Sequence, residues 1–531
     1  MTRWRTSRSI WLWDALWLLV ASAVVAYVFW RNNVIMSRVI DGTRYYSIDD
    51  DMMISMTYAR NLAEGHGLVW NAGGEHVEGY TNFLWTLVMA GVHKLGAPDA
   101  TASAWVRACS YVFVIGTLIQ SVRVVRVFVP HGLVVTPLFL IAAVTNNDII
   151  TWAAWGFETA LMSFLLMTFV RSVLGDSSSV VAWFALALVP LTRSDGIHIF
   201  AACALFGFLI APEKKRQILT RIVPAALPVI AHFVWRRSYY GDWLPNTYYL
   251  KVYLLDRVHH RGFVYARNFL MAYSIICTLA IAGSAAMARR DRRALFLILI
   301  LATTLLYTIQ VGGDMFGSFR FCAHLMPLLY VFAACGFTHV ATSSWMNRTA
   351  WALAMIFATM PLIKPLDRLS VLDGNGAVQD QMQVAMLIKK NALPNSVVAV
   401  IAAGVVPYFS RHPAIDLFGK GDRHIAHLPP YPGSLIGHGK IDPAYSFNVL
   451  KPDLVVSLRP NSWVQTLSKP TINTDSYLGV LSSEPFYNQY RPNLVANDFT
   501  NELTAIYARQ DSPEAARRST WRPLVVEPPP K

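Results

Sequence analysis

Long apolar runs recur along the first 364 residues of this 531-residue chain, and they constrain its fold more than any other feature. The first run, Trp11 to Trp30, has about 20 residues, enough for one helix to cross ~30 Å of hydrocarbon. Charged residues make up only 15% of the chain, against about 25% in soluble domains. This composition rules out a disordered chain, argues against a soluble enzyme, and indicates an integral membrane protein with many spans.

Lys and Arg orient these runs, because both residues are enriched in cytoplasmic loops. The formal net charge is +14, and we attribute it to such loops rather than to nucleic-acid binding. With every basic cluster in the cytoplasm, about 11 transmembrane helices thread consistently and the C-terminal part lies outside. The run 82–96 is left as an interfacial or re-entrant segment. The predicted crossings are 11–30, 103–122, 132–147, 157–174, 180–192, 197–210, 222–238, 263–287, 294–310, 322–343 and 350–364.

The composition changes near residue 365, where the long apolar runs end and Pro, Asn, Asp and Gly become more frequent. The pattern predicts an amphipathic helix over 377–391, a buried strand over 396–403, and further strands over 414–417 and 453–458. The expected fold class is therefore mainly α, a polytopic membrane helix bundle followed by an extracytoplasmic α/β domain. The predicted domains are 1–364, with a first external catalytic loop at 31–81, and 365–531. All five cysteines lie in apolar runs, so the external domain must fold without disulfides.

Three adjacent carboxylates, Asp49-Asp50-Asp51, lie in the first external loop. They repel one another, so folding alone gives little reason for them. One interpretation is an acidic turn that caps a helix beginning near Met52. The other is a general base or a divalent-cation ligand at the membrane surface. The loop continues with interleaved glycine, aromatic and polar residues through Asn82, a mixture typical of carbohydrate sites.

Other ionisable residues interrupt the external ends of the apolar runs. Glu158, at the mouth of an apolar helix, is either a functional group or an interfacial residue within reach of water. Arg193 and Asp195 break an apolar stretch, and they could simply pair with each other. Arg320 is a candidate phosphate clamp, because a guanidinium binds phosphate through two hydrogen bonds, and pairing with Asp314 is the alternative.

An aromatic-rich external loop runs from Tyr239 to Lys251. An interfacial belt of Tyr and Trp would explain its aromatic residues but not Asp242, Asn246 and Lys251, of which Lys251 could neutralise a phosphate. In the tail, His438 and Lys440 lie in a stretch rich in Gly and Pro, where a lone histidine is more often an ordinary surface residue. The sequence carries no Walker A or Rossmann glycine motif, so nucleotide-powered chemistry is not expected.

Several blocks of the sequence resemble the membrane glycosyltransferases of the GT-C superfamily, and within it the AftB-type terminal arabinofuranosyltransferases and related pilin-modifying arabinosyltransferases. The likeness covers nearly the whole chain. It implies a polyprenyl-phosphate sugar donor, with arabinofuranose as the sugar, and a glycan or glycoprotein acceptor outside the bacterial cytoplasmic membrane. The blocks are IDDDMMISMTYARNLAEGHGLVW, WGFETAL, LTRSDG, YYGDWLPNTYYLK, VGGDMFGSFRF and AIDLFGKGDRHIA.

The resemblance also implies roles for individual residues. Asp50 or Asp51 would be the catalytic carboxylate, which activates the acceptor hydroxyl or supports the positive charge that develops on the sugar. A divalent cation is left open, and no other cofactor and no nucleic acid are expected. The residues expected to bind substrate are Asp49, Glu158, Arg193, Asp195, Asp242, Asn246, Lys251, Asp314, Arg320, His438 and Lys440.

Two alternative functions fit the same general composition. One is a transporter or flippase of a lipid-linked sugar, which would be expected to show two related halves, and the sequence shows no such repeat. The other is a GT-C enzyme for a different sugar, such as a hexose.

Overall fold

The computed structural model describes residues 8–525 with several gaps. The chain divides into two compact units, and three of the five borders between them fall within long helices. These helices are α1 (Arg8–Ile35), α4 (Asp99–Phe128) and α10 (Lys215–Tyr240). The helical unit comprises Met1–Asn32, Arg107–Val234 and Leu254–Leu372, and the mixed unit comprises Asn33–Val106, Trp235–Tyr253 and Asp373–Lys531. The gaps are 131–132, 134, 211–213, 253–254, 290, 315–317, 341–374, 431–438, 461–479, 481–482, 497–502, 518–520 and 523.

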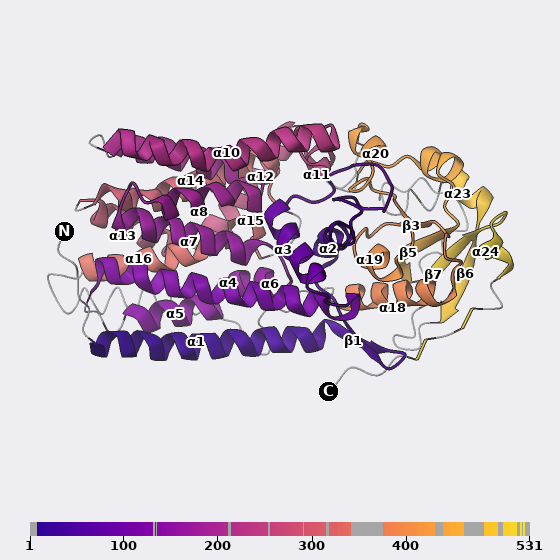
Figure 1. Ribbon diagram of the computed structural model, residues 1–531, viewed down its shortest axis with the longest axis horizontal. Helices are drawn as coiled ribbons and strands as arrows, with labels where there is room; N and C mark the ends of the chain where they lie inside the picture. Colours follow the sequence, from indigo (N-terminus) through magenta and orange to yellow (C-terminus); the bar gives the residue numbers. More distant parts are fainter. Residues whose placement is uncertain are drawn as a thin grey trace. The chain divides into compact units, whose positions relative to one another are not determined.

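Helices make up the helical unit (Figure 1). Within the described residues, four helical segments are long and apolar enough to cross a membrane: α1, α4, α10 and Arg292–Val311, which joins η2 (Arg292–Leu295) to α14 (Phe296–Val311). The multi-pass membrane fold predicted from the sequence is confirmed. The remaining helices are α5 (Val135–Thr145), α6 (Asn147–Ala154), α7 (Thr159–Gly175), α8 (Val180–Thr192), α9 (Gly196–Ile210), α12 (Leu255–Ala272), α13 (Ser274–Ala288), α15 (Arg320–Ala323) and α16 (Met326–Val340).

In their described residues, all the predicted crossings before residue 341 overlap helices, and the predicted crossing 350–364 lies outside the described residues. The predicted crossing 263–287 is not a single straight helix, because Arg257–Ala272 and Ser274–Ala288 are bent by 81° at Tyr273. The hydroxyl of this tyrosine donates a hydrogen bond of 2.6 Å to Asp148 Oδ2, which anchors the break to α6. A run of apolar residues cannot predict such a bend.

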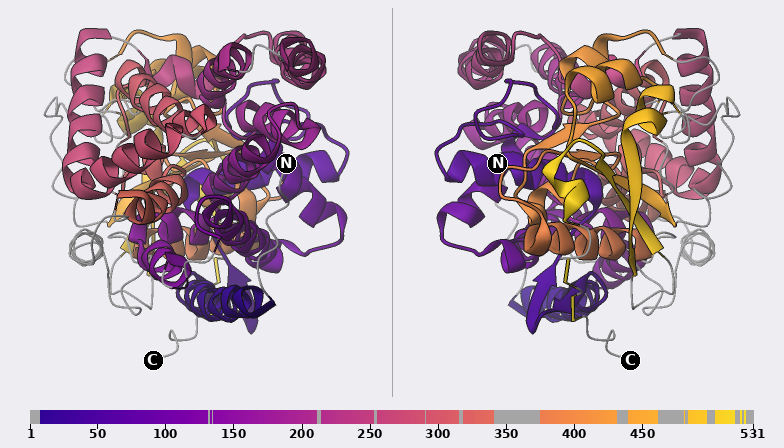
Figure 2. Two further views of the ribbon diagram at one scale, coloured as in Figure 1. Left: turned by 90° about the vertical axis from the view of Figure 1, so that its left-hand side faces the viewer. Right: turned by 90° about the vertical axis from the view of Figure 1, so that its right-hand side faces the viewer.

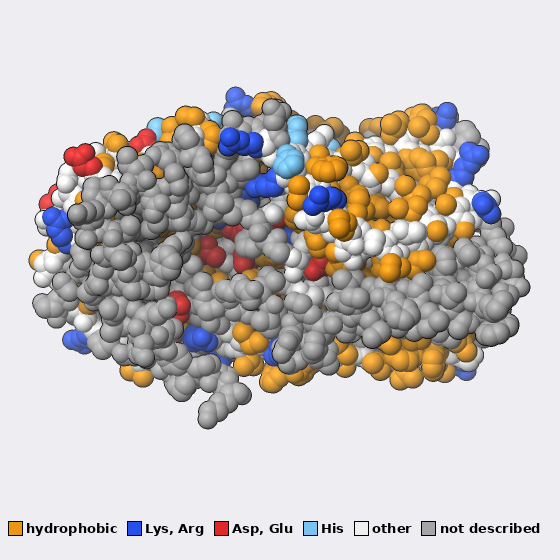
Figure 3. Space-filling model, turned by 180° about the vertical axis from the view of Figure 1, so that it is seen from behind, with side chains coloured by type: hydrophobic (Ala, Val, Ile, Leu, Met, Phe, Trp, Pro, Cys, Tyr) orange, Lys and Arg blue, Asp and Glu red, His pale blue; other side chains and the backbone are white. Residues whose placement is uncertain are grey.

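The outer surface of the helical unit is apolar, as a lipid-facing surface requires. Leu219, Val223 and Leu227 on α10 are about half exposed, as are Leu16 and Leu19 on α1. Figure 3 shows hydrophobic side chains covering the described surface of this unit, with Lys and Arg side chains at its end.

The mixed unit contains a five-stranded sheet whose strand order is β4-β3-β5-β7-β6 (Figures 1 and 2). Strands β3 and β4 are parallel, β3 and β5 are parallel, and β7 pairs antiparallel with both β5 and β6. The strands are β3 (Val398–Val400), β4 (Ala414–Asp416), β5 (Leu454–Pro460), β6 (Tyr490–Ala496) and β7 (Leu503–Arg509). A separate hairpin pairs β1 (Ser37–Ile40) with β2 (Thr43–Tyr46).

The mixed unit also contains helices, most of them short. The predicted helix over 377–391 is α18 (Asn375–Asn391), and α3 (Phe83–Lys94) has only 12 residues, too few for a span of its own. The predicted domain boundary near residue 365 lies outside the described residues. The other helices are α2 (Asp50–Ala63), α11 (Asn246–Lys251), α19 (Val405–Ser410), α20 (Arg423–His427), η4 (Tyr445–Val449), α23 (Glu484–Gln489) and α24 (Pro513–Ala516).

Aromatic side chains from η4, α23, β6 and β7 form the core beside the sheet, centred on Phe447, Phe486, Tyr490 and Tyr507. Because β3 and β4 are parallel, their carboxyl ends meet at one edge, where the loops 401–404 and 417–422 begin. In α/β sheets this edge is the usual place for a ligand.

Candidate active site

The acidic triplet lies at the beginning of α2. Asp49 is the N-cap residue, and its Oδ1 accepts a hydrogen bond of 3.0 Å from the backbone N–H of Asp51. The capping interpretation is therefore confirmed for Asp49, although the helix begins at Asp50 rather than near Met52. A capped start fixes the first turn, so Asp50 and Asp51 project from a rigid element.

Asp50 contacts the loop after β3. Its Oδ1 accepts hydrogen bonds from the backbone N–H groups of Gly404, at 3.2 Å, and Val405, at 2.8 Å. A methyl group at Gly404 would lie 1.8 Å from the carbonyl oxygen of Asp50, so only glycine permits this approach. Burial raises the pKa of Asp50 to about 6, against the opposing effects of Lys420 and the Val405 N–H.

Asp51 is paired with a lysine that the sequence reasoning missed. Lys420 Nζ lies 2.6 Å from Asp51 Oδ1, and the two residues are separated by 369 positions in the chain. Burial alone would lower the pKa of Lys420, but the charges of Asp51 and Asp50 raise it above its usual value. The ammonium therefore stays charged beside the two carboxylates. Its only sequence signal is a place in the block AIDLFGKGDRHIA, directly after a predicted strand.

Two side chains hold the loop that carries Lys420. The carboxylate of Asp416, at the end of β4, accepts from the N–H of Phe418 at 2.9 Å and of Gly421 at 2.8 Å. Asn246 Nδ2 donates to the carbonyl oxygens of Gly419 at 2.7 Å, Lys420 at 3.1 Å and Asp422 at 3.1 Å. Asn246, predicted to bind substrate, thus fixes the backbone around Lys420.

A buried ion pair joins Glu78, in the segment between α2 and α3, to Arg236 on α10. Arg236 Nε is 2.6 Å from Glu78 Oε2, and both side chains are 2% exposed. Burial raises the pKa of Glu78 to about 7, although Arg236 acts in the opposite direction. The backbone carbonyl of Glu78 accepts from the N–H of Asn246 at 2.9 Å, which ties this loop to α11.

In the helical unit, Arg193 lies between two carboxylates. Its Nη1 donates to Glu158 Oε1 at 2.9 Å and its Nη2 donates to Asp195 Oδ2 at 2.8 Å. All three side chains are nearly buried, and the guanidinium carbon lies 4.9 Å from the ring centre of Phe321. The predicted pairing of Arg193 with Asp195 is confirmed, and Arg193 forms a second ion pair with Glu158.

Arg320 belongs to the same unit and pairs with Asp314, as the alternative interpretation predicted. Its guanidinium carbon lies 4.9 Å from the ring centre of Phe157. A cation held over an aromatic face and against a carboxylate is strongly fixed in position. Its proposed contact with phosphate stays a prediction.

The remaining predicted residues differ in their surroundings. Lys440 is buried, its Nζ donates to the carbonyl oxygens of Tyr249 at 2.9 Å and Ala426 at 2.7 Å, and burial lowers its pKa. Lys251 ends α11. His438 lies outside the described residues.

Asp242 lies in a different environment from the acidic triplet. One of its oxygens, Oδ2, is 3.4 Å from Arg423 Nε and 4.0 Å from His427 Nε2. It therefore belongs to a polar cluster around α20.

The possible divalent cation can be tested against the donor set. Among the described residues, no group of three or more His, Cys, Asp or Glu side chains is placed to hold a metal ion. Beside Asp50 and Asp51 the third group is the ammonium of Lys420, a cation rather than a ligand. The described residues here do not by themselves fit a metal centre.

The fold of this chain is similar to that of the solved structures of ArnT. ArnT from Cupriavidus metallidurans, in its apo state, superposes with a TM-score of 0.57 over 93% of this chain and 98% of ArnT, at 12% sequence identity. The same enzyme bound to undecaprenyl phosphate gives a TM-score of 0.56, covering 92% of this chain and 98% of ArnT at 12% identity. The chain therefore shares the fold of ArnT, and the polytopic helical fold class expected from the sequence is confirmed.

Sequence comparison points to a particular kind of relative. The chain is 25% identical to the terminal beta-(1->2)-arabinofuranosyltransferase of Corynebacterium glutamicum over 356 residues, which is 59% of this chain and 51% of that protein. The Mycobacterium tuberculosis enzyme of the same name is 25% identical over 274 residues, 48% of this chain and 43% of that protein. The aligned region thus spans about half the length of these relatives or less. Residues 374–506 also match a domain of unknown function, DUF8728.

Proposed function

We propose that the chain is a membrane glycosyltransferase that moves a sugar, arabinofuranose, from a polyprenyl-phosphate donor to a glycan or glycoprotein acceptor outside the cytoplasmic membrane. The observation that carries the proposal is the pair Asp50 and Asp51 beside Lys420, at the edge of the sheet where the parallel strands β3 and β4 end. The names of the sequence relatives support the sugar, and the undecaprenyl phosphate bound by ArnT supports the donor.

Asp50 is the proposed general base. A carboxylate whose pKa lies near 6 accepts a proton from an acceptor hydroxyl more readily at neutral pH than an ordinary aspartate. Lys420 would neutralise the charge of Asp51 beside this base. Asp51 is also able to support positive charge that develops on the sugar. Energy comes from the donor's phosphate bond, so no nucleotide is required.

Asp50→Asn tests the base while leaving its structural contact intact, since an amide oxygen can still accept from Gly404 and Val405. We expect the transfer rate to fall by at least about 100-fold. The assay uses the full chain in nanodiscs, a synthetic polyprenyl-phospho-arabinofuranose and an arabinan acceptor. Asp176→Asn is the matched control, because Asp176 is 48% exposed and its partner is Lys214. An unchanged transfer rate in Asp50→Asn would show that Asp50 is not the general base.

The same assay separates the alternatives. Faster transfer from a hexose-linked donor than from the arabinofuranose donor would show that the enzyme transfers a hexose. Movement of the lipid-linked sugar across proteoliposomes without transfer to an acceptor would favour a flippase. Chelation with EDTA followed by addition of Mg²⁺ or Mn²⁺ tests the open question of a divalent cation.

We propose that Arg193, Arg320 and Lys251 are the cationic partners of the donor phosphate. Arg193 and Arg320 already contact carboxylates, so phosphate would have to share their guanidinium groups. Arg320→Lys keeps the charge but loses the planar pair of donors. A rise in donor KM without a change in acceptor KM would support this role, and an unchanged donor KM would contradict it.

A further inference from the structure

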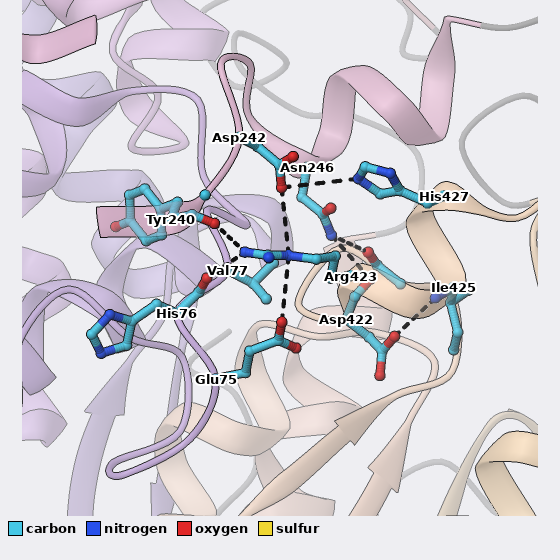
Figure 4. Close-up of polar contacts among 12 residues, drawn as sticks. Glu75, His76, Val77, Tyr240, Asp242, Asn246, Asp422, Arg423, Ile425 and His427 are labelled. Atoms are coloured by element: carbon cyan, nitrogen blue, oxygen red, sulfur yellow. Dashed lines mark hydrogen bonds and ion pairs between the residues drawn. The ribbon is translucent and has the colours of Figure 1, made fainter. Parts of the chain in front are cut away.

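A pocket lined mainly by polar residues lies beside α20 of the mixed unit, and none of the mechanism above uses it. Its cavity has a volume of about 470 Å³, within the range of 300–1,000 Å³ that is usual for small-molecule sites. The pocket is lined by Glu75, Arg423, His424, His427 and Leu428. Figure 4 shows Arg423 between Glu75 and Asp242, with His427 on the far side of Asp242.

Two carboxylates lie against Arg423: Glu75, which also lines the pocket, and Asp242, which is not among the lining residues. The Nε of Arg423 lies 3.4 Å from Glu75 Oε1 and 3.4 Å from Asp242 Oδ2, and its Nη2 donates to the carbonyl oxygens of His76 and Tyr240. Among the described lining residues it is the single Lys or Arg side chain. An anionic ligand such as a phosphate would meet carboxylates on both sides of this guanidinium, so the pocket favours a neutral ligand.

The pocket also presents flat rings. His427 and Tyr249 lie 4.3 Å apart between ring centres, and His424 and Tyr445 lie 4.2 Å apart. Both histidines remain accessible, at 41% and 46% exposure of their side chains. His424 Nε2 is 2.9 Å from Asp442 Oδ2, which fixes its ring. Fixed rings beside hydrogen-bonding carboxylates suit a polyhydroxylated ligand, which offers apolar C–H faces and many hydroxyl groups.

The chain connects this pocket directly to Lys420. Arg423 follows Lys420 by three residues, and Asp422 caps α20 by accepting from the N–H of Ile425 at 2.9 Å. The amide of Asn246 holds the carbonyl oxygens of both Lys420 and Asp422. One rigid loop therefore carries the lysine of the candidate active site and the first residue of the pocket.

We propose that this pocket binds a neutral saccharide segment of the acceptor glycan and holds it for reaction at Asp50 and Asp51. The proposal rests on the proposed glycosyltransferase function. It assigns acceptor recognition to Glu75, His424 and His427, and leaves the lipid-linked donor to other parts of the molecule.

The test compares acceptor and donor kinetics for Glu75→Gln and His427→Ala in the full chain in nanodiscs. Both side chains are exposed, at 60% and 41%, so folding should be preserved, and thermal unfolding checks this. We expect acceptor KM to rise about tenfold in each variant, equivalent to the loss of about one hydrogen bond, with kcat and donor KM unchanged. Glu484→Gln, an exposed glutamate on α23 of the same unit, is the matched control and should leave every constant unchanged.

A binding measurement keeps the pocket testable apart from the reaction. Saturation-transfer NMR with an arabinofuranose oligosaccharide should give a signal in the wild-type chain that both pocket variants weaken and inorganic phosphate does not displace. An unchanged acceptor KM, a rise in donor KM instead, or displacement by phosphate would overturn the proposal. Binding of an acceptor peptide but not of the oligosaccharide would also overturn it. A wild-type chain that binds the oligosaccharide but transfers no sugar would refute the proposed function while leaving the pocket in place.

Discussion

The three residues at the centre of the candidate site have unequal surroundings, and this inequality gives each a separate role. Asp50 accepts hydrogen bonds from two backbone N–H groups, whereas Asp51 forms an ion pair with the ammonium of Lys420. The site therefore offers one carboxylate whose pKa burial raises to about 6, and a second one that forms an ion pair with Lys420.

The first prediction concerns pH. Because the pKa of Asp50 is raised to about 6, kcat/KM should fall as the pH drops below about 6, where the base becomes protonated. The charge of Lys420 lowers this pKa, so Lys420→Met should move the acidic limb of the profile to higher pH. Profiles of kcat/KM against pH, recorded from about pH 4.5 to about pH 8.5, give the acidic midpoint of the wild-type chain and of Lys420→Met. A midpoint that does not move in Lys420→Met would contradict the assignment.

The same shift has a consequence for stability with a defined sign. The pKa of Asp50 in the folded protein is above its ordinary value of 3.8, so its protonated form favours the folded state. Its stabilising contribution is complete below about pH 3.8 and is lost as the pH rises through about 6. Ionised Asp50 therefore costs folding free energy at the pH where it would act as a base.

The second prediction concerns the buried pair of Glu78 and Arg236. Glu78→Gln leaves a buried guanidinium without its carboxylate, and we expect a loss of about 3–5 kcal/mol in unfolding free energy. Adding Arg236→Met should recover part of this loss, because the unpaired charge is then removed. Thermal unfolding in detergent measures both variants, and additive losses would show that the two side chains are not coupled.

At the scale of elements, the contact between the start of α2 and the start of α19 depends on one glycine. Gly404→Ala would place a methyl group 1.8 Å from the Asp50 carbonyl, so α19 must move and the two hydrogen bonds to Asp50 must break. We expect this third prediction to appear as lost transfer activity and a lower Tm. Gly91→Ala on α3 is the control, since nothing lies within 4 Å of its added methyl and helical Ala is favoured over Gly. Wild-type activity in Gly404→Ala would show that the contact is not required.

The elements that the sequence predicted are those whose pattern is local. Apolar runs located the helices of the helical unit, and β-branched residues located β3 and β5. Strand β6 was not predicted, because Pro492 interrupts its pattern of residues. The structure places this strand at the edge of the sheet, where proline is tolerated. The bend at Tyr273 depends on a hydrogen bond to Asp148 over 125 positions, which no window of sequence contains.

The candidate site shows the same division. The acidic triplet was recognisable from three adjacent letters, but its partner Lys420 is 369 positions away from Asp51 and gave no signal of its own. Asn246 was recognised as unusual for its loop, but the backbone it supports could be known only from the fold.

At the scale of the whole molecule, the fourth prediction concerns the two sides of the membrane. We propose that the basic loops face the cytoplasm and the mixed unit faces the outside. In whole cells, Glu75→Cys should react with a membrane-impermeant maleimide, whereas Lys214→Cys should react only after permeabilisation. The five native cysteines are buried or partly buried, which limits background labelling. Labelling of Lys214→Cys in intact cells would reverse the proposed orientation.

The mixed unit draws on three separate stretches of the chain, and this limits how such a protein can change over time. The aspartate pair comes from the first stretch, the Asn246 amide from the second and Lys420 from the third. An exchange of the C-terminal third with that of a distant relative would bring in a lysine loop without the amide and carboxylates that match it. New acceptor preferences should therefore arise through coordinated point substitutions across all three stretches rather than through wholesale tail swapping.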